Sequence, residues 1–208
     1  TKNYLSQLLT LTLFSLFLAQ NKETISKDTY NSLIEDIQKL PEYVSQILNQ
    51  EEKIKNIAEK YALSREFLFI GRGVNYPSAL EGALKLKEIS YIHATGYPAG
   101  ELKHGPIALI DAKLPVVCIA PETSTYEKMI SNIQEVKARK GNIIAVATEG
   151  NKDIQSYTKD ILYIPKISEE LTPILVAIPL QLLAYHIAIK LDCDVDQPRN
   201  LAKSVTVE

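Results

Sequence analysis

The chain has 208 residues, of which 46% are hydrophobic and 23% are charged. This composition is ordinary for a folded globular chain and excludes an intrinsically disordered one. The 23 basic and 25 acidic side chains leave a formal net charge of -2, so the composition does not indicate the basic surface that nucleic-acid binding requires. The length permits one or two domains.

Taken in chain order, the first feature is the apolar segment 8–19 (LLTLTLFSLFLA). It superficially resembles the apolar part of a signal peptide. It lacks a small-x-small cleavage pattern, and it is shorter than the roughly 20 residues that span a bilayer. We therefore expect a buried helix and no membrane segment. The absence of an initial Met leads us to expect that the chain begins inside a longer protein.

The first 62 residues predict helices only. Apolar residues recur at helical spacing on one face over 33–48 and again over 54–61. Pro41 is expected to break or begin a helix between these faces. No residue in this part indicates chemistry, so we interpret it as packing and linking material.

Beyond Leu63, short continuous apolar runs alternate with helical patterns. The runs predict strands buried on both faces at 67–70, 116–120, 143–147 and 161–164. Strands that alternate with helices predict an α/β fold with a parallel sheet and right-handed crossovers.

Two further helices are predicted, at about 124–140 and 172–191. The second is apolar nearly all round, so we expect it to be buried on more than one side, with a kink at Pro179. His186 lies on this helix and is interpreted as a core or interface histidine.

The cysteines are Cys118 and Cys193, which lie far apart and form no CxxC pair. They are too few to hold a disulfide-rich secreted scaffold or, with three histidines, a structural zinc site. We therefore expect a reducing, cytoplasmic setting and no metal. Cys118 lies in the apolar run 115–120, where a buried and unreactive thiol is expected.

In open α/β sheets, ligands bind beyond the carboxyl ends of the strands. The first such place here is Gly71-Arg-Gly73. Tyr76 stands where a dinucleotide-binding fingerprint needs a third small residue, which excludes that motif. The turn can bind an anion at a helix N-terminus, or it can serve only as a turn.

The helix that follows, about 76–92, carries Glu81, Lys85 and Glu88 on one face. One interpretation is a solvated, ion-paired stripe. The alternative is the lining of a partly buried pocket, because apolar neighbours flank the charges and the small Gly82 permits close packing of another element.

The loop 100–106 (GELKHGP) places an acid, a base and an imidazole between glycines. Core packing explains such a histidine poorly. His104 is therefore a better candidate acid or base than His93 or His186.

Two long segments carry a family resemblance: 71–111 (GRGVNYPSALEGALKLKEISYIHATGYPAGELKHGPIALID) and the tail 194–208 (DVDQPRNLAKSVTVE). The chain resembles the isomerising glutamine:fructose-6-phosphate aminotransferase family. Residues 63–208 are similar to its second sugar-isomerase (SIS) domain with the C-terminal active-site tail. Residues 1–62 are similar to the helical end of the first SIS domain plus the connector. The resemblance implies a flavodoxin-like parallel sheet of about five strands, flanked by helices and preceded by a helical segment.

This resemblance implies a function. The complete enzyme takes ammonia from glutamine in a glutaminase domain and delivers it to fructose 6-phosphate in a pair of SIS domains. The products are glucosamine 6-phosphate and glutamate, in the first step of hexosamine synthesis. No cofactor is implied. The implied partners are the sugar phosphates, the glutaminase domain, the first SIS domain and a second subunit of a homodimer.

The motifs carry the family's roles onto this sequence. Glu88 of KLKE becomes the base that moves a proton between sugar C1 and C2, with Lys85 in the same active site. His104 assists ring opening from the neighbouring subunit. In the tail, Lys203 forms an imine with the C2 carbonyl, and Ala202 contacts the substrate through its backbone. Acid–base help of this kind contributes about 10² to 10⁴ in rate.

Two alternatives remain at this point, a phosphosugar-binding regulatory module and a stand-alone phosphosugar isomerase. The presence of Glu88, His104 and Lys203 together argues against the first, and the tail argues against the second. The chain lacks the glutaminase cysteine and the Ser/Thr-rich phosphate loop of the family. Alone, it is expected neither to hydrolyse glutamine nor to bind fructose 6-phosphate tightly.

Overall fold

The computed structural model describes residues 2–199 and 201. The chain begins with the helices α1 (Lys2–Asn21), α2 (Lys27–Leu48) and α3 (Glu51–Tyr61). The strands are β1 (Glu66–Gly71), β2 (His93–Pro98), β3 (Pro115–Ala120), β4 (Asn142–Thr148) and β5 (Ile161–Ile164). The later α-helices are α4 (Tyr76–Ser90), α5 (Tyr126–Ala138) and α6 (Thr172–Lys190). Short 3₁₀ segments are η1 (Gly73–Asn75), η2 (Ala99–His104), η3 (Pro106–Leu109), η4 (Asp153–Ser156) and η5 (Glu169–Leu171).

In the described part of the chain, the five strands form one parallel sheet in the order β2-β1-β3-β4-β5. This is the order of flavodoxin-like sheets. The α/β class, the parallel sheet and four of its strands are therefore confirmed.

Strand β2 was not predicted, because its residues HATGYP form no apolar run. They include Gly96 and Pro98, and most of them are only partly buried at the sheet edge. Gly96 has a packing reason. A Cβ there would lie 3.0 Å from the Ala79 carbonyl oxygen of α4. At this position the strand has no side chain because the helix packs directly against its backbone. It therefore lacks the continuous apolar run by which the other strands were predicted.

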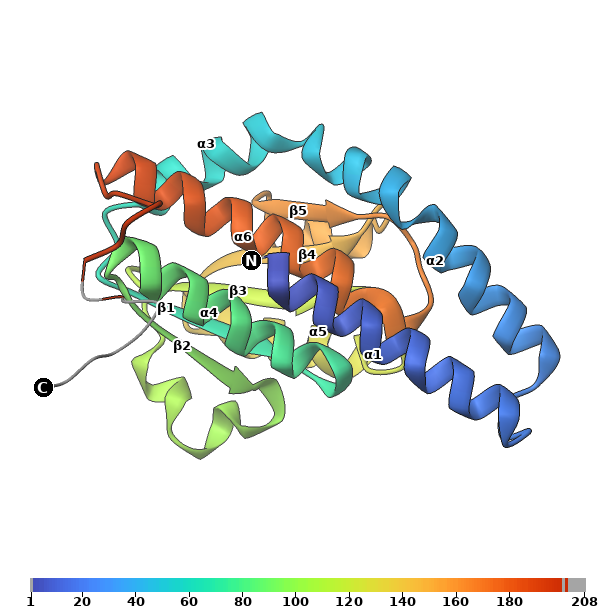
Figure 1. Cartoon of the computed structure of the whole chain (residues 1–208). Coiled ribbons are helices and arrows are strands. Elements are labelled where there is room, and N and C mark those ends of the chain that lie inside the picture. Colours follow the sequence, from blue (N-terminus) through green and yellow to red (C-terminus); the bar gives the residue numbers. More distant parts are fainter. Residues whose placement is uncertain (1, 200, 202–208) are drawn as a thin grey trace, which may run out of the picture.

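Successive residues of the strands point to opposite faces of the sheet and contribute to two apolar layers. On one face, strand residues such as Phe69, Val117 and Ile144 pack with α4, α6 and the first three helices. On the other face, residues such as Ile70, Cys118 and Ala145 pack with α5. Figure 1 shows α1, α4 and α6 in front of the sheet and α5 behind it. Because one apolar core includes both α1–α3 and the sheet, the division at residues 62 and 63 stays a prediction.

Pro41 neither breaks nor begins a helix, contrary to expectation. Helix α2 continues through it. The buried residues Leu33, Leu40 and Ile47 hold both halves of α2 against the core. This packing offsets the one backbone hydrogen bond that an exposed proline removes, so tertiary contacts override local propensity.

The expectation that segment 8–19 is buried was wrong for this chain. Leu16 is the buried residue of α1, whereas several large apolar side chains are exposed: Leu11, Leu13, Phe14, Phe17 and Leu18. These side chains are exposed because of where α1 lies in the fold. Helix α1 lies outside the α4–α6 layer and contacts it with one face only.

Helix α6 is buried on several sides, as expected. The segment Glu169–Lys190 is long and apolar enough to cross a membrane, but 72% of its most apolar window is buried inside the fold. That burial is what a core helix requires. His186 is also buried, with its ring edge-on to Tyr185 at 5.1 Å and its Nε2 3.3 Å from Glu51 Oε1. The interpretation of His186 as a core histidine is confirmed.

Cys118 lies fully buried in β3, and burial raises the pKa of its thiol. Cys193 is only half-buried after α6. Because the thiolate is the reactive form, we predict that native protein releases about one equivalent of chromophore with a thiol–disulfide reagent, and two in denaturant. Cys193→Ser should abolish the native reaction. A fast second equivalent from native protein would contradict the buried placement of Cys118.

Candidate active site

The candidate site depends on how closely α4 approaches its neighbours. A Cβ at Gly82 would lie 2.9 Å from Leu180 Cδ1 of α6 and 3.0 Å from the Phe69 ring of β1. Such distances leave no room for a larger residue. The expectation that Gly82 permits close packing is confirmed, and the next turns of α4 lie directly beside α6.

Lys85 and Glu88 form an ion pair one helical turn beyond Gly82, between Lys85 Nζ and Glu88 Oε2. Their side chains are only 18% and 28% exposed. Both line a cavity of about 390 Å³, whose other walls include Gln181 and Tyr185 of α6. For these two residues the pocket interpretation is therefore confirmed over the solvated stripe.

Glu81 lies one turn before Lys85 on α4 but does not line this cavity. Burial raises the pKa of its carboxyl, the positive charge of Lys85 opposes that rise, and the negative charge of Glu88 adds to it. The three charges therefore act on one another along one helix face, as their spacing predicted.

The chain beyond α6 forms another wall of the cavity. Val195 and Asp196 line it together with Glu88. Asp194 Oδ1 accepts hydrogen bonds from the backbone N–H groups of Asp196 and Gln197, both at 2.9 Å. The start of the tail thus has a defined turn that faces the ion pair. Ala202 and Lys203 lie outside the described residues.

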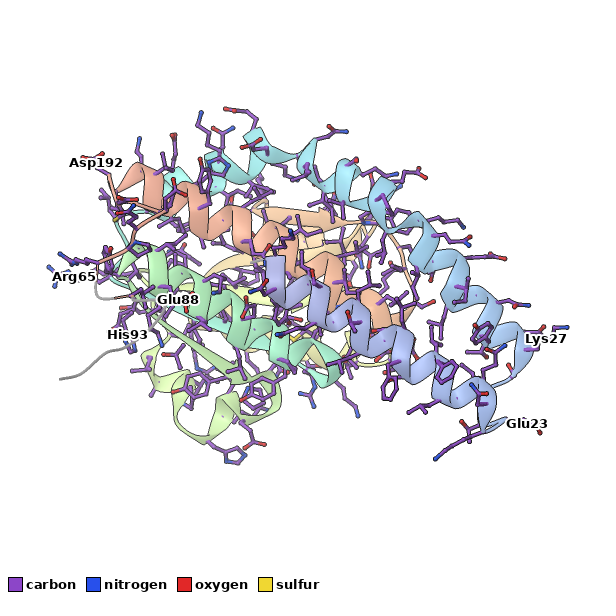
Figure 2. The ribbon with its side chains drawn as sticks, in the orientation of Figure 1. Glu23, Lys27, Arg65, Glu88, His93 and Asp192 are labelled. Atoms are coloured by element: carbon purple, nitrogen blue, oxygen red, sulfur yellow. The ribbon has the colours of Figure 1, made fainter. Side chains whose placement is uncertain are left out.

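His104 lies apart from Glu88. It ends η2, which follows the carboxyl end of β2, whereas Glu88 precedes the amino end of that strand. Six residues of β2 separate the two ends, a length of about 20 Å. Figure 2 shows Glu88 at the same end of the molecule as Arg65 and His93, the residues near the amino ends of β1 and β2.

The His104 side chain is 74% exposed and lies 3.9 Å from Glu101 Oε2. Within one chain, the structure therefore brings Lys85 and Glu88 together but does not bring His104 to them.

The glycine turn 71–73 lies at the opposite end of α4 from Glu88. A Cβ at Gly71 would lie 2.3 Å from the Asn75 carbonyl oxygen, and Arg72 Nη1 donates to Asn132 Oδ1 at 2.9 Å. Close backbone approach explains the glycine, and the arginine has a partner. These contacts favour a purely structural turn.

A larger cavity, of about 680 Å³, opens near the amino ends of β1 and β4. Its lining includes Lys60, Arg65 and Asp111 but none of the predicted site residues. We favour the smaller cavity as the candidate active site, because it holds a carboxylate paired with a lysine in a half-buried setting. Among residues 2–199 and 201, no group of three or more His, Cys, Asp or Glu side chains could hold a metal ion.

Sequence reasoning missed Gln181. It is the first amide in α6 after a continuous apolar run, and that interruption was the available signal. Its Nε2 is buried and has no hydrogen-bond partner among the described residues, in a side chain that lines the cavity. A donor left without a partner beside an ion pair is suited to a polar ligand.

Comparison with known proteins shows the family to which the chain belongs. The family model described as "SIS domain" matches residues 60–191. The chain belongs to the SIS domain family.

The SIS chain is also similar over its whole length to the C-terminal part of curated proteins named glutamine–fructose-6-phosphate aminotransferase (isomerizing). Identity is 51% for the protein of Thermus thermophilus and 53% for that of Aquifex aeolicus. The chain spans 34% of the length of each of these relatives. The suspected resemblance to this family is confirmed.

A solved structure gives the same assignment. The C-terminal domain of the Francisella tularensis glucosamine-fructose-6-phosphate aminotransferase matches with a TM-score of 0.88 and 39% identity, over 95% of this chain and 56% of that one. A putative tagatose-6-phosphate ketose/aldose isomerase from Clostridium novyi matches with a TM-score of 0.72 at 20% identity, over 87% of this chain and 50% of that one, and shows the fold alone.

The orphaned amide of Gln181 gives a stability prediction. Gln181→Leu removes a buried donor and keeps most of the volume, so the free energy of unfolding should stay unchanged or rise by about 1 kcal/mol. The matched variant Gln181→Ala should lower it, because it leaves a void. Urea unfolding of this chain measures both. A clear loss of stability in Gln181→Leu would show that the amide has a partner.

Proposed function

We propose that this chain is the isomerase part of an enzyme that converts fructose 6-phosphate and glutamine into glucosamine 6-phosphate and glutamate. The proposal is carried by the Lys85–Glu88 ion pair, which lies in a cavity walled by α6 and the tail. The names of the similar proteins and the SIS fold support sugar-phosphate isomerisation as the coarser function.

In this proposal Glu88 performs the proton transfer. An aldose–ketose shift removes a proton from C1 of the open-chain sugar, passes through a C1–C2 double bond and returns a proton to C2. The electron pair of the C1–H bond forms that double bond while the π pair of the C2 carbonyl moves onto its oxygen, which takes a proton. Loss of the C1 hydroxyl proton then forms the C1 carbonyl as C2 is protonated. One carboxylate that reaches both carbons performs both transfers. The half-buried setting of Glu88 permits this, since water does not fully solvate the carboxylate.

Lys85 would hold that carboxylate in place through a direct contact of opposite charges. Its ammonium group contacts Glu88, and both side chains are largely buried. Removal of the lysine would leave a half-buried carboxylate without its partner.

The tail would bring Lys203 and Ala202 to the sugar. Arg199 contacts Tyr91, and Lys203 lies four residues further along the chain. That length of chain spans at most about 14 Å. Lys203 is proposed to form the imine with the sugar C2 carbonyl, which requires an unprotonated amine and therefore a dry pocket.

His104 is proposed to act in a neighbouring subunit. Its exposure and its distance from Glu88 along β2 support a role outside its own cavity. The proposal accordingly includes a homodimer, together with a glutaminase domain and a first SIS domain elsewhere in the full-length protein. A cytoplasmic location is proposed with it.

The test replaces the proposed base in the full-length enzyme. Glu88→Gln should lower sugar isomerisation by about 10² to 10⁴ and leave fructose 6-phosphate binding largely intact, because the amide keeps the shape but accepts no proton. Turnover and calorimetric binding measure the two effects. Glu81→Gln, on the same helix face but outside the cavity, is the matched control and should retain activity. Near-normal turnover by Glu88→Gln would remove Glu88 from this role.

A further inference from the structure

Tyr91 is the C-cap residue that directly follows α4, and its backbone conformation is unusual. Its φ of 62° and ψ of 8° place it in the left-handed region, and its N–H donates to the Lys87 carbonyl oxygen. Glycine is the usual residue at such a helix end because a side chain there is strained. Here the position carries a large aromatic phenol, three residues after Glu88.

The phenol contacts the tail in two ways. Tyr91 Oη accepts a hydrogen bond from the backbone N–H of Arg199 at 2.7 Å. The Arg199 guanidinium carbon lies 4.3 Å from the centre of the Tyr91 ring, which is cation–π geometry. One residue of the tail is thus held by both its backbone and its side chain.

The contact between Tyr91 and Arg199 lies close to the cavity that holds Glu88. Val195 and Asp196 line the cavity beside Glu88, and Arg199 is fixed at Tyr91, past the C-terminal end of α4. The tail therefore passes one wall of the cavity and is fastened immediately beyond it. The turn made by Asp194 limits its freedom on the near side.

We propose that Tyr91 is a positioning residue that fastens the C-terminal tail at Arg199, so that the tail walls the Glu88 cavity. The fastening is a property of this chain. Its catalytic consequence rests on the proposed function, because only there does the tail act on a substrate.

The fastening is tested without substrate. Tyr91→Phe keeps the ring and removes the hydrogen-bond acceptor, so hydrogen exchange of the Arg199 amide, followed by NMR on this chain, should become roughly tenfold faster. Tyr76→Phe, at the other end of α4, is the matched control and should leave that exchange unchanged. An unchanged rate in Tyr91→Phe would overturn the proposal.

The positioning role is tested by turnover in the full-length enzyme. Tyr91→Phe and Arg199→Ala should each lower kcat for isomerisation several-fold, and the double variant should lose no more than the worse single variant, because both act on one contact. Arg199→Lys should restore part of the loss, since a cation is kept. The thermal unfolding midpoint should stay unchanged. Normal kcat in Tyr91→Phe despite faster exchange would overturn the positioning role, whereas an inactive natural enzyme would refute the proposed function and leave the exchange result standing.

Discussion

The close approach of α4 to α6 is the constraint on which the candidate site depends. Gly82 lets Leu180 and Phe69 fill the space where a side chain would otherwise stand. The same approach sets Lys85 and Glu88 beside Gln181 and Tyr185 and so creates a half-buried cavity between two helices. A wider separation would hydrate the ion pair and return it to an ordinary surface stripe.

The site combines groups with different structural supports. The ion pair lies on a rigid helix held by the sheet, whereas another wall is formed by the chain that follows α6. A rigid base with a separately fastened tail suits a reaction that must first admit a sugar phosphate and then exclude water. His104 extends from the far end of β2, so a single copy of the described chain holds only part of the proposed chemistry.

Much of the fold could be predicted from the sequence because the buried strands are continuous apolar runs, as in 116–120 and 143–147. The ion pair could also be predicted, since residues three apart on a helix must share a face. What could not be predicted depends on contacts far apart in the sequence. Strand β2 carries little apolar signal because α4 packs onto its glycine.

Contacts between residues far apart in the sequence also explain the other differences between the predicted and the observed structure. Pro41 stays within a helix because buried neighbours hold it there, and the exposure of α1 depends on what packs against it. The contact between Tyr91 and Arg199 joins residues that are 108 positions apart in the sequence, and neither residue type predicts it. Local patterns thus predicted the helices and the charged pair, while the walls around the pair required the folded chain.

In the proposed function, a carboxylate on α4 moves a proton between two sugar carbons. Fructose 6-phosphate carrying two deuterium atoms at C1 tests it most directly in the full-length enzyme, with NMR of the product. We expect a product with one deuterium at C1, the other having moved to C2 or to water, and almost none of this product from the Glu88→Gln enzyme. A Glu88→Gln enzyme that forms this product as fast as the natural enzyme would show that Glu88 does not move the proton.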